Sequence, residues 1–203
     1  MVAFYKHLRR KYVKRRKKGG RKKGVDICIP DRISITMRPE IINNREHYGD
    51  WESDSVLFSH QKQARSVQYE RKSQWLRWHL VADKSAVETT RALTQTFKPL
   101  PEPLKQSCTV DNGGENYGYT IIRDSFKMET YFCEPYHSWQ KGGGENINGL
   151  LRQYLPRQTA VSKLTEEDIH SLQEKFHNRL RKSLDGLTPN EVIAEFLKSK
   201  VGH

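Results

Sequence analysis

The chain has 203 residues and a formal net charge of +12, from 36 Lys and Arg against 24 Asp and Glu. This length suits one domain with a tail, and no apolar run approaches the ~18 residues that a membrane-spanning helix needs. The basic N-terminus lacks the apolar core of a signal peptide. The cysteines show no CxxC spacing and the histidines no HExxH motif, which argues against a zinc site. Cys108 and Cys133 are interpreted as small apolar residues in strands of a reduced, intracellular protein.

The positive charge is concentrated at the N-terminus. Residues 1–24 hold twelve Lys and Arg and no acidic residue, so the remainder of the chain is electrically balanced. Such a block repels itself into an extended arm, and its natural ligand is a polyanion such as nucleic acid. A solvated tail or a localisation signal is the alternative. Within the arm, we expect DNA contacts from Lys14, Arg15, Arg16, Lys17 and Lys18.

The first half of the chain predicts strands. Residues 25–45 are interpreted as an extended, proline-punctuated lead-in, and residues 48–58 as a first strand. Two more strands are predicted at 66–69 and 75–82, because the latter alternates Leu, Trp and Leu with polar side chains. The intervening residues 70–73 are a plausible turn.

The hydrophobic period then changes to that of helices. Ser85 and Glu88 have the spacing of a capping box, and the helix they open continues to Phe97. The following predicted elements are a strand at 107–110, a helix at 117–126, a strand at 131–133, a helix from Glu145, a helix opened by Thr165, and a last helix opened by Thr188, Pro189 and Glu191. This order predicts an α/β fold with a mixed sheet and helices on both faces.

The stretch WQKGGGENINGLLRQ, residues 139–153, leads into a helix with two distinct faces. The apolar face comprises Ile147, Leu150, Leu151, Tyr154 and Leu155, and the polar face comprises Glu145, Asn148, Gly149 and Arg152. Glu145 is either an ordinary first-turn acid, favourable to the helix dipole, or a ligand. On the second interpretation, glycines 142–144 let the backbone approach DNA closely.

Three carboxylates make chemical sense together. Asp54 lies in a predicted strand, Asp111 at a strand end and Glu145 on a helix face, although DNGG alone would only indicate a turn. An ionised carboxylate along a sheet is costly unless it is paired or bound to metal. Mg²⁺ prefers oxygen ligands, and two ions can support an in-line phosphoryl displacement. We therefore expect these acids to converge on divalent cations.

Five segments of the sequence resemble those of a known family of proteins. The matching segments are GDWESD (49–54), ERKS (70–73), TVDNGGE (109–115), YFCEPYHSWQKGGGENINGLLRQY (131–154) and NRLRKSLDGLTPNEV (178–192). They resemble the DDE transposases of the IS-thirty insertion-sequence family, in that family's order and with its spacing between the second acid and the glutamate. The resemblance implies a ribonuclease-H-like catalytic domain over residues 48–198 with a five-stranded mixed sheet. It also implies that Asp54, Asp111 and Glu145 are the catalytic residues and the ligands of Mg²⁺ or Mn²⁺, with two ions when DNA is bound.

The resemblance further implies metal-dependent DNA cleavage and strand transfer during transposition. The expected partners are the element's DNA ends and target DNA, with a homo-oligomer assembled on DNA and a cytoplasmic, nucleoid-associated location in a bacterium. In the folded region, the expected DNA contacts are Lys141, Asn148, Arg152, Arg181 and Lys182. Residues 1–47 show no helix-turn-helix pattern, so we expect them to form a DNA-contacting arm and lead-in without the family's N-terminal recognition region.

Two alternatives from other classes remain open at this stage. One is a truncated, non-enzymatic DNA-binding protein that interferes with full-length transposase. The other is a basic RNA-binding or ribosome-associated protein, which only the composition favours. The presence of all three acids argues against the RNA-binding alternative and weakens the non-enzymatic one.

Overall fold

A computed structural model describes residues 29–59, 61–135, 137–156 and 158–201. The basic arm and Cys28 lie outside these residues. The described chain forms one mixed sheet in the order β1-β6-β5-β2-β3-β4. The strands are β1 (Ile33–Ser34), β2 (Asp50–Leu57), β3 (Ala64–Glu70), β4 (Leu76–Val81), β5 (Ser107–Val110) and β6 (Glu129–Phe132).

The expectation of five strands is wrong by one, because β1 pairs in parallel with β6. β1 lies inside the segment predicted to be only an extended lead-in. It has two residues, too few to display the alternation by which a strand is recognised in a sequence. The other five strands lie where the sequence predicted them, within a few residues.

The sheet combines an antiparallel meander with a parallel half. β2, β3 and β4 are neighbouring antiparallel strands, whereas β2 pairs in parallel with β5, and β5 with β6. In the β2–β5 register, Glu52 lies opposite Thr109. Continuing that register by two residues brings Asp54 beside Asp111, at the end of β5.

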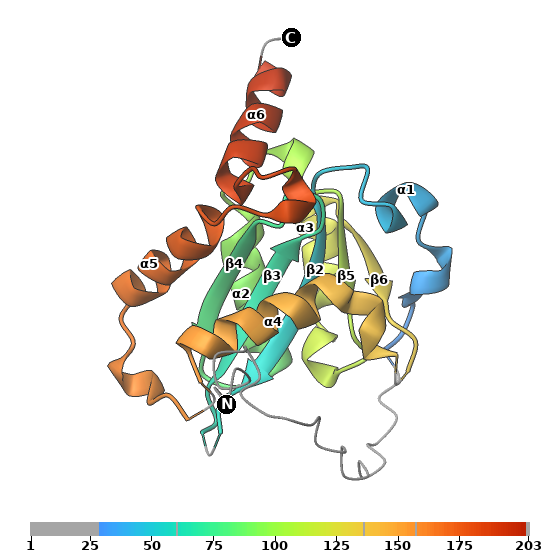
Figure 1. Ribbon diagram of the computed structural model, residues 1–203. Coiled ribbons are helices and arrows are strands. Elements are labelled where there is room, and N and C mark those ends of the chain that lie inside the picture. The colour runs from blue at the N-terminus through green and yellow to red at the C-terminus, as the bar shows by residue number, and fades with distance from the viewer. Residues whose placement is uncertain (1–28, 60, 136, 157, 202–203) are drawn as a thin grey trace, which may run out of the picture.

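Helices cover both faces of the sheet, which confirms the predicted architecture (Figure 1). The helices are α1 (Glu40–Asn43), α2 (Ala86–Phe97), α3 (Tyr119–Phe126), α4 (Gly142–Tyr154), α5 (Glu166–His177) and α6 (Pro189–Val201). In Figure 1, α4 lies across the front of β2 and β3, and α2 and α3 lie behind the sheet.

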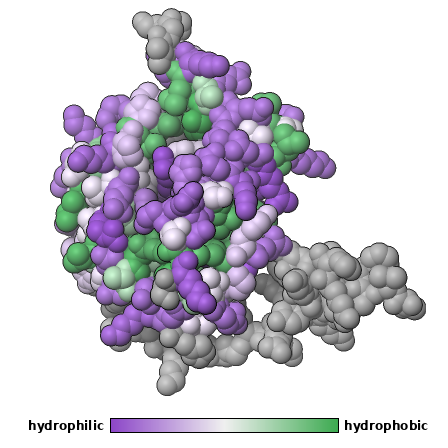
Figure 2. Space-filling view, turned by 90° about the vertical axis from the view of Figure 1, so that its left-hand side faces the viewer, coloured by the Kyte–Doolittle hydropathy of each residue, from purple (hydrophilic) through white to green (hydrophobic). Residues whose placement is uncertain are grey.

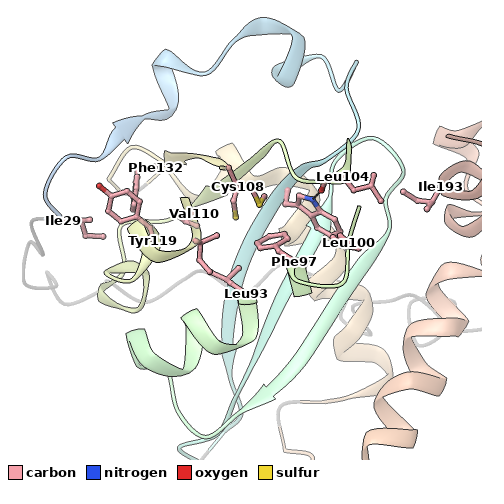
Figure 3. Close-up of a cluster of buried hydrophobic side chains, with 13 residues drawn as sticks. Ile29, Leu93, Phe97, Leu100, Leu104, Cys108, Val110, Tyr119, Phe132 and Ile193 are labelled. Atoms are coloured by element: carbon pink, nitrogen blue, oxygen red, sulfur yellow. Dashed lines mark hydrogen bonds between the residues drawn. The ribbon is translucent and has the colours of Figure 1, made fainter. Parts of the chain in front are cut away.

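Each face has its own hydrophobic core. Behind the sheet, Phe97 of α2 packs with Trp51 and Cys108 in a cluster that Figure 3 shows in close-up. In front, Ile147 and Leu151 of α4 belong to a second cluster with Val67, Trp78 and Phe176. The burial of these apolar side chains explains why α4 lies flat against the sheet.

The starts of two helices test the capping boxes that the sequence predicted. At α6, the Thr188 hydroxyl accepts a hydrogen bond from Glu191 N at 3.2 Å while the Glu191 carboxylate accepts one from Thr188 N at 2.7 Å, which confirms the predicted capping box. At α2, Ser85 accepts from Glu88 N, but the Glu88 carboxylate accepts from Ala82 N. The second half of that predicted box is therefore absent.

The surface is mixed, and the described cysteines are buried. No helix among the described residues is long and apolar enough to cross a membrane, and Figure 2 shows mainly hydrophilic side chains with smaller hydrophobic groups between them on the face it displays. Cys108 lies in β5, and Cys133 directly follows β6; both are free thiols. Burial raises the pKa of Cys108 to about 12 and that of Cys133 to about 11, as expected for small apolar core residues.

Candidate active site

Two of the three predicted acids meet between the neighbouring strands β2 and β5, where β5 ends. Asp54 extends from β2, and Asp111 follows the last residue of β5. Both carboxylates keep contact with water, since the Asp54 side chain is 28% exposed and that of Asp111 36%. In open α/β sheets, binding sites form at the carboxyl ends of parallel strands, which is where Asp111 lies.

The ammonium group of Lys141 joins these two carboxylates. Lys141 Nζ lies 3.4 Å from Asp54 Oδ1 and 3.6 Å from Asp111 Oδ2, and it donates a hydrogen bond to Ser53 O at 2.9 Å. Lys141 is only 4% exposed. Burial alone would lower its pKa, but the charges of Asp54 and Asp111 outweigh burial and raise the pKa. Lys141 therefore remains charged and neutralises part of the site.

Two asparagines orient the carboxylates. Asn148 of α4 donates from Nδ2 to Asp54 Oδ2 at 2.7 Å, and Asn116 donates from Nδ2 to Asp111 Oδ1 at 2.9 Å. Gly113 N donates to the same Asp111 oxygen at 3.1 Å. These bonds restrict rotation of both carboxyl groups and leave oxygen atoms directed at one small region.

A second lysine adds positive charge beside Asp111. Lys84 pairs with the buried carboxylate of Glu115 at 2.5 Å. Burial by itself raises the pKa of Asp111, but the charges of Lys141 and Lys84, with the hydrogen bond from Gly113, hold it below its usual value. Asp111 is therefore ionised at neutral pH.

The third predicted acid is carried by α4. Glu145 lies one helical turn before Asn148, whose side chain contacts Asp54. The side chain of Glu145 is outside the described part of the structure. Among the side chains that are described, no group of three or more metal-ligating residues is present, and the site there consists of Asp54 and Asp111.

The glycines before Glu145 differ in how closely they approach the sheet. A Cβ atom on Gly143 would clash with the ring of Tyr69, and one on Gly144 would lie 3.5 Å from Glu52 Oε2. The absence of a side chain at Gly143 thus permits the close approach of α4 to the sheet, whereas a Cβ atom on Gly144 would meet Glu52 at an ordinary contact distance. Gly142 differs from them, because a Cβ atom there would have no neighbour within 4 Å among the described residues.

The structure separates the expected DNA contacts of the folded region into two groups. Lys141, Asn148 and Arg181 are buried, with exposures of 4%, 3% and 9%. Arg152 and Lys182 are exposed. Asn148, on the predicted polar face, donates a hydrogen bond to Asp54 and is shielded from solvent. The arm residues Lys14, Arg15, Arg16, Lys17 and Lys18 lie outside the described residues.

Several site residues were missed by reasoning from the sequence. Asn116 and Glu115 follow Asp111 within the segment DNGGEN, where they were interpreted only as turn residues. Glu52 precedes Asp54 by two positions and therefore shares its face of β2, a signal that the period of a strand could have supplied. Lys84 had no pattern that distinguished it from a surface lysine.

Comparison with solved structures identifies the fold. The structure is similar to the catalytic core domain of BIV integrase, with a TM-score of 0.58 and 19% identity over 75% of this chain and 98% of that domain. This similarity confirms the ribonuclease-H-like, integrase-core fold. No protein-family model matches the chain.

Comparison of the sequence finds relatives among the transposases of insertion sequences. The chain is 34% identical to the transposase for insertion sequence element IS4351 from Bacteroides fragilis, over 96% of this chain and 59% of the relative. It is also 34% identical to the transposase InsI for insertion sequence element IS30A from Escherichia coli, over 92% of this chain and 49% of the relative. The chain is thus similar, over most of its length, to transposases of IS-thirty and related insertion sequences, and it spans about half the length of the relatives it matches.

Proposed function

We propose that this chain carries the catalytic region of a transposase that cleaves DNA and transfers the cut strand to a target, using divalent metal ions. The observation that carries the proposal is the convergence of Asp54 and Asp111 on one cation, the Lys141 ammonium. The relatives, which are named as transposases of insertion sequences, support the same activity.

The site suits a divalent metal. Its donors are carboxylate oxygens, the ligands that Mg²⁺ and Mn²⁺ prefer, and these oxygens already share a positive charge. Asp54 and Asp111 would hold the metal, and Glu145 would complete the set from α4. Divalent ions bound in this way supply activation of the attacking oxygen and stabilisation of the leaving oxygen in a phosphoryl transfer.

The chain's own residues supply orientation and charge balance. Asn148 and Asn116 fix the rotation of the two aspartates, so that the carboxylates need little reorganisation when substrate arrives. Lys141 limits the repulsion between the aspartates and lies where it can balance the charge of a DNA phosphate.

The proposed reaction has two displacements of the same type. A water oxygen first attacks a DNA phosphorus, and the bond from phosphorus to the 3′ oxygen breaks, which releases a 3′-OH. That 3′-OH then attacks a target phosphorus, forming a new phosphodiester as the target's 3′ oxygen leaves with a proton. Each step makes and breaks one P–O bond, so no oxidant or nucleotide cofactor is required.

DNA binding in this proposal comes mainly from residues 1–24, with Arg152 and Lys182 as exposed cations of the folded region. A homo-oligomer assembled on DNA, and a nucleoid-associated location in the cytoplasm, belong to the same proposal. Phosphate contacts of this kind position the protein without reading sequence.

The test is a joining assay on branched DNA that mimics the strand-transfer product. Because the displacement is reversible in principle, this substrate reports the chemistry without requiring recognition of element ends. Wild-type protein should resolve the branch, which means that it rejoins the target strand and releases the transferred strand, in Mg²⁺ or Mn²⁺ and not in EDTA. Asp54→Asn and Glu145→Gln should lose the reaction while retaining DNA binding.

The matched control is Asp124→Asn, which changes an exposed carboxylate on α3 that pairs with Arg123. This variant should keep wild-type activity. Metal-dependent DNA binding without any joining by wild-type protein would instead favour the non-enzymatic alternative, and activity retained by Glu145→Gln would remove that residue from the site.

A further inference from the structure

The turn ERKS, residues 70–73, has no part in the proposed chemistry, yet one of its side chains reaches the base of α4. Arg71 Nη1 pairs with Glu52 Oε1, and the two side chains are 5% and 1% exposed. The other carboxylate oxygen, Glu52 Oε2, accepts a hydrogen bond from Gly144 N at 2.8 Å. One buried carboxylate therefore connects the turn after β3 to the residue before Glu145.

Arg71 is held in place from the opposite side. It donates from Nε to Ile42 O at 3.3 Å and from Nη2 to Asn43 O at 3.2 Å, both carbonyls of α1. A guanidinium group has donors in a fixed planar arrangement, so these bonds set the direction in which its remaining donor meets Glu52. The carboxylate is thus fixed by rigid elements.

The contact lies at a point where α4 has little other local support. The helix begins with three glycines, which are poor helix formers, and it lacks a side-chain cap at its N-terminus. A carboxylate that accepts a hydrogen bond from an N-terminal N–H group also interacts favourably with the helix dipole. Glu52 therefore performs, from the sheet, the function of the missing cap.

We propose that Glu52 and Arg71 form a positioning pair that sets the start of α4, and with it the backbone of Glu145, relative to Asp54 and Asp111. Glu52 and Asp54 are two residues apart on one face of β2, so the strand that supplies an acid of the site also holds the helix that carries the third acid. This inference rests on the proposed function only for the consequence for catalysis; the geometric claim stands on the contacts alone.

The experiment compares three variants of the full chain. Glu52→Gln removes the charge with nearly unchanged shape, and Arg71→Lys retains a cation but loses the paired contacts to α1. Glu70→Gln is the matched control, because Glu70 is also a buried carboxylate of this region but accepts hydrogen bonds from Gly49 and Ser73 rather than from α4. Unfolding temperature and the circular dichroism spectrum establish that each variant folds.

The first measurement is hydrogen exchange of the Gly144 amide by NMR. Since a hydrogen bond to a charged group is lost, exchange should accelerate roughly tenfold or more in Glu52→Gln. Arg71→Lys should show a smaller acceleration, and Glu70→Gln should match wild type at this amide even if it melts earlier.

The second measurement separates the rate of branch resolution from DNA binding. Glu52→Gln should reduce kcat by about 10- to 100-fold, as loss of a supporting contact typically does, while KM for DNA stays within about twofold of wild type, because the variant removes no DNA contact. If wild-type protein lacks the activity, the proposed function fails but the Gly144 exchange still tests the pair.

Unchanged Gly144 exchange in a folded Glu52→Gln would overturn the proposal, as would an equal effect of Glu70→Gln on exchange and kcat. If Glu52→Gln does not fold, Arg71→Lys decides: Gly144 exchange and kcat equal to those of wild type would show that the pair does not position α4.

Discussion

Replacing Lys141 with methionine should destabilise the metal-free protein and make its stability more dependent on Mg²⁺. Methionine retains an unbranched apolar side chain of similar length but removes the ammonium group. The substitution thus leaves Asp54 and Asp111 without the cation that lies 3.4 Å and 3.6 Å from their oxygens. It also removes the hydrogen bond to Ser53 O.

The magnitude follows from two opposing contributions. Loss of one partner of a fully buried ion pair costs about 3–5 kcal/mol, whereas exposed pairs contribute about 0–1 kcal/mol. Here the lysine is buried, but the carboxylates are 28% and 36% exposed and can regain water. We therefore expect a loss of about 1–3 kcal/mol in the free energy of unfolding, or roughly 2–12 °C in melting temperature for a domain of this size.

The assay is thermal unfolding with and without Mg²⁺. The increase in melting temperature caused by Mg²⁺ should be larger for Lys141→Met than for wild type, because its two aspartates have no competing ammonium. The control is Lys105→Met, since Lys105 pairs with the exposed Glu102 at 3.0 Å and precedes the start of β5, whereas Asp111 follows its end. A Lys141→Met variant with wild-type stability, and no greater response to Mg²⁺ than wild type, would refute this reasoning.

Three further predictions follow from local features. Gly143→Ala should lose about 1–3 kcal/mol in urea unfolding because its Cβ clashes with the Tyr69 ring, whereas Gly142→Ala should be neutral or gain up to about 1 kcal/mol; equal effects would refute the close approach of α4. The pKa of Glu70 is raised from 4.5 to about 7, chiefly by burial, so the folded state binds this proton more tightly than the unfolded state. The free energy of unfolding should therefore fall by up to about 3 kcal/mol from pH 4.5 to 7. Glu70→Gln should abolish this fall, and a wild-type pH profile in that variant would contradict the prediction. The affinity of the full chain for DNA should fall by about 10³- to 10⁵-fold between 50 and 200 mM salt. Deleting residues 1–24 should make this dependence on salt weaker, and an unchanged slope would assign the contacts to the folded domain.

The sequence predicted well those features that have local physical signatures. The strand at Ser107–Val110 and the capping box at Thr188 depend on short-range patterns, and the structure confirms both. Asp54 and Asp111 were identified because ionised side chains along a sheet require a partner. The identity of that partner, Lys141, could not be predicted, since its position depends on how η5 (Ser138–Lys141) packs against β2.

The start of α4 shows why features that depend on long-range contacts were not predictable from the sequence. Three glycines are unfavourable in a helix, so the sequence placed the first helical residue at Glu145, whereas α4 begins at Gly142. The extra turn depends on Glu52 and Tyr69, which lie more than seventy residues earlier in the chain. Contacts over such a separation outweigh local propensity, and a single sequence does not display them.

The proposed role of Asp54, Asp111 and Glu145 is to hold the metal that supports DNA strand transfer. Its most direct test is the anomalous scattering of Mn²⁺ in crystals of the chain bound to branched DNA. We predict an anomalous peak contacted by the carboxylates of Asp54 and Asp111, with the Glu145 carboxylate beside it and a DNA phosphate oxygen in the same coordination shell. Mn²⁺ bound elsewhere, or a Glu145 carboxylate on the far side of the sheet, would contradict the claim.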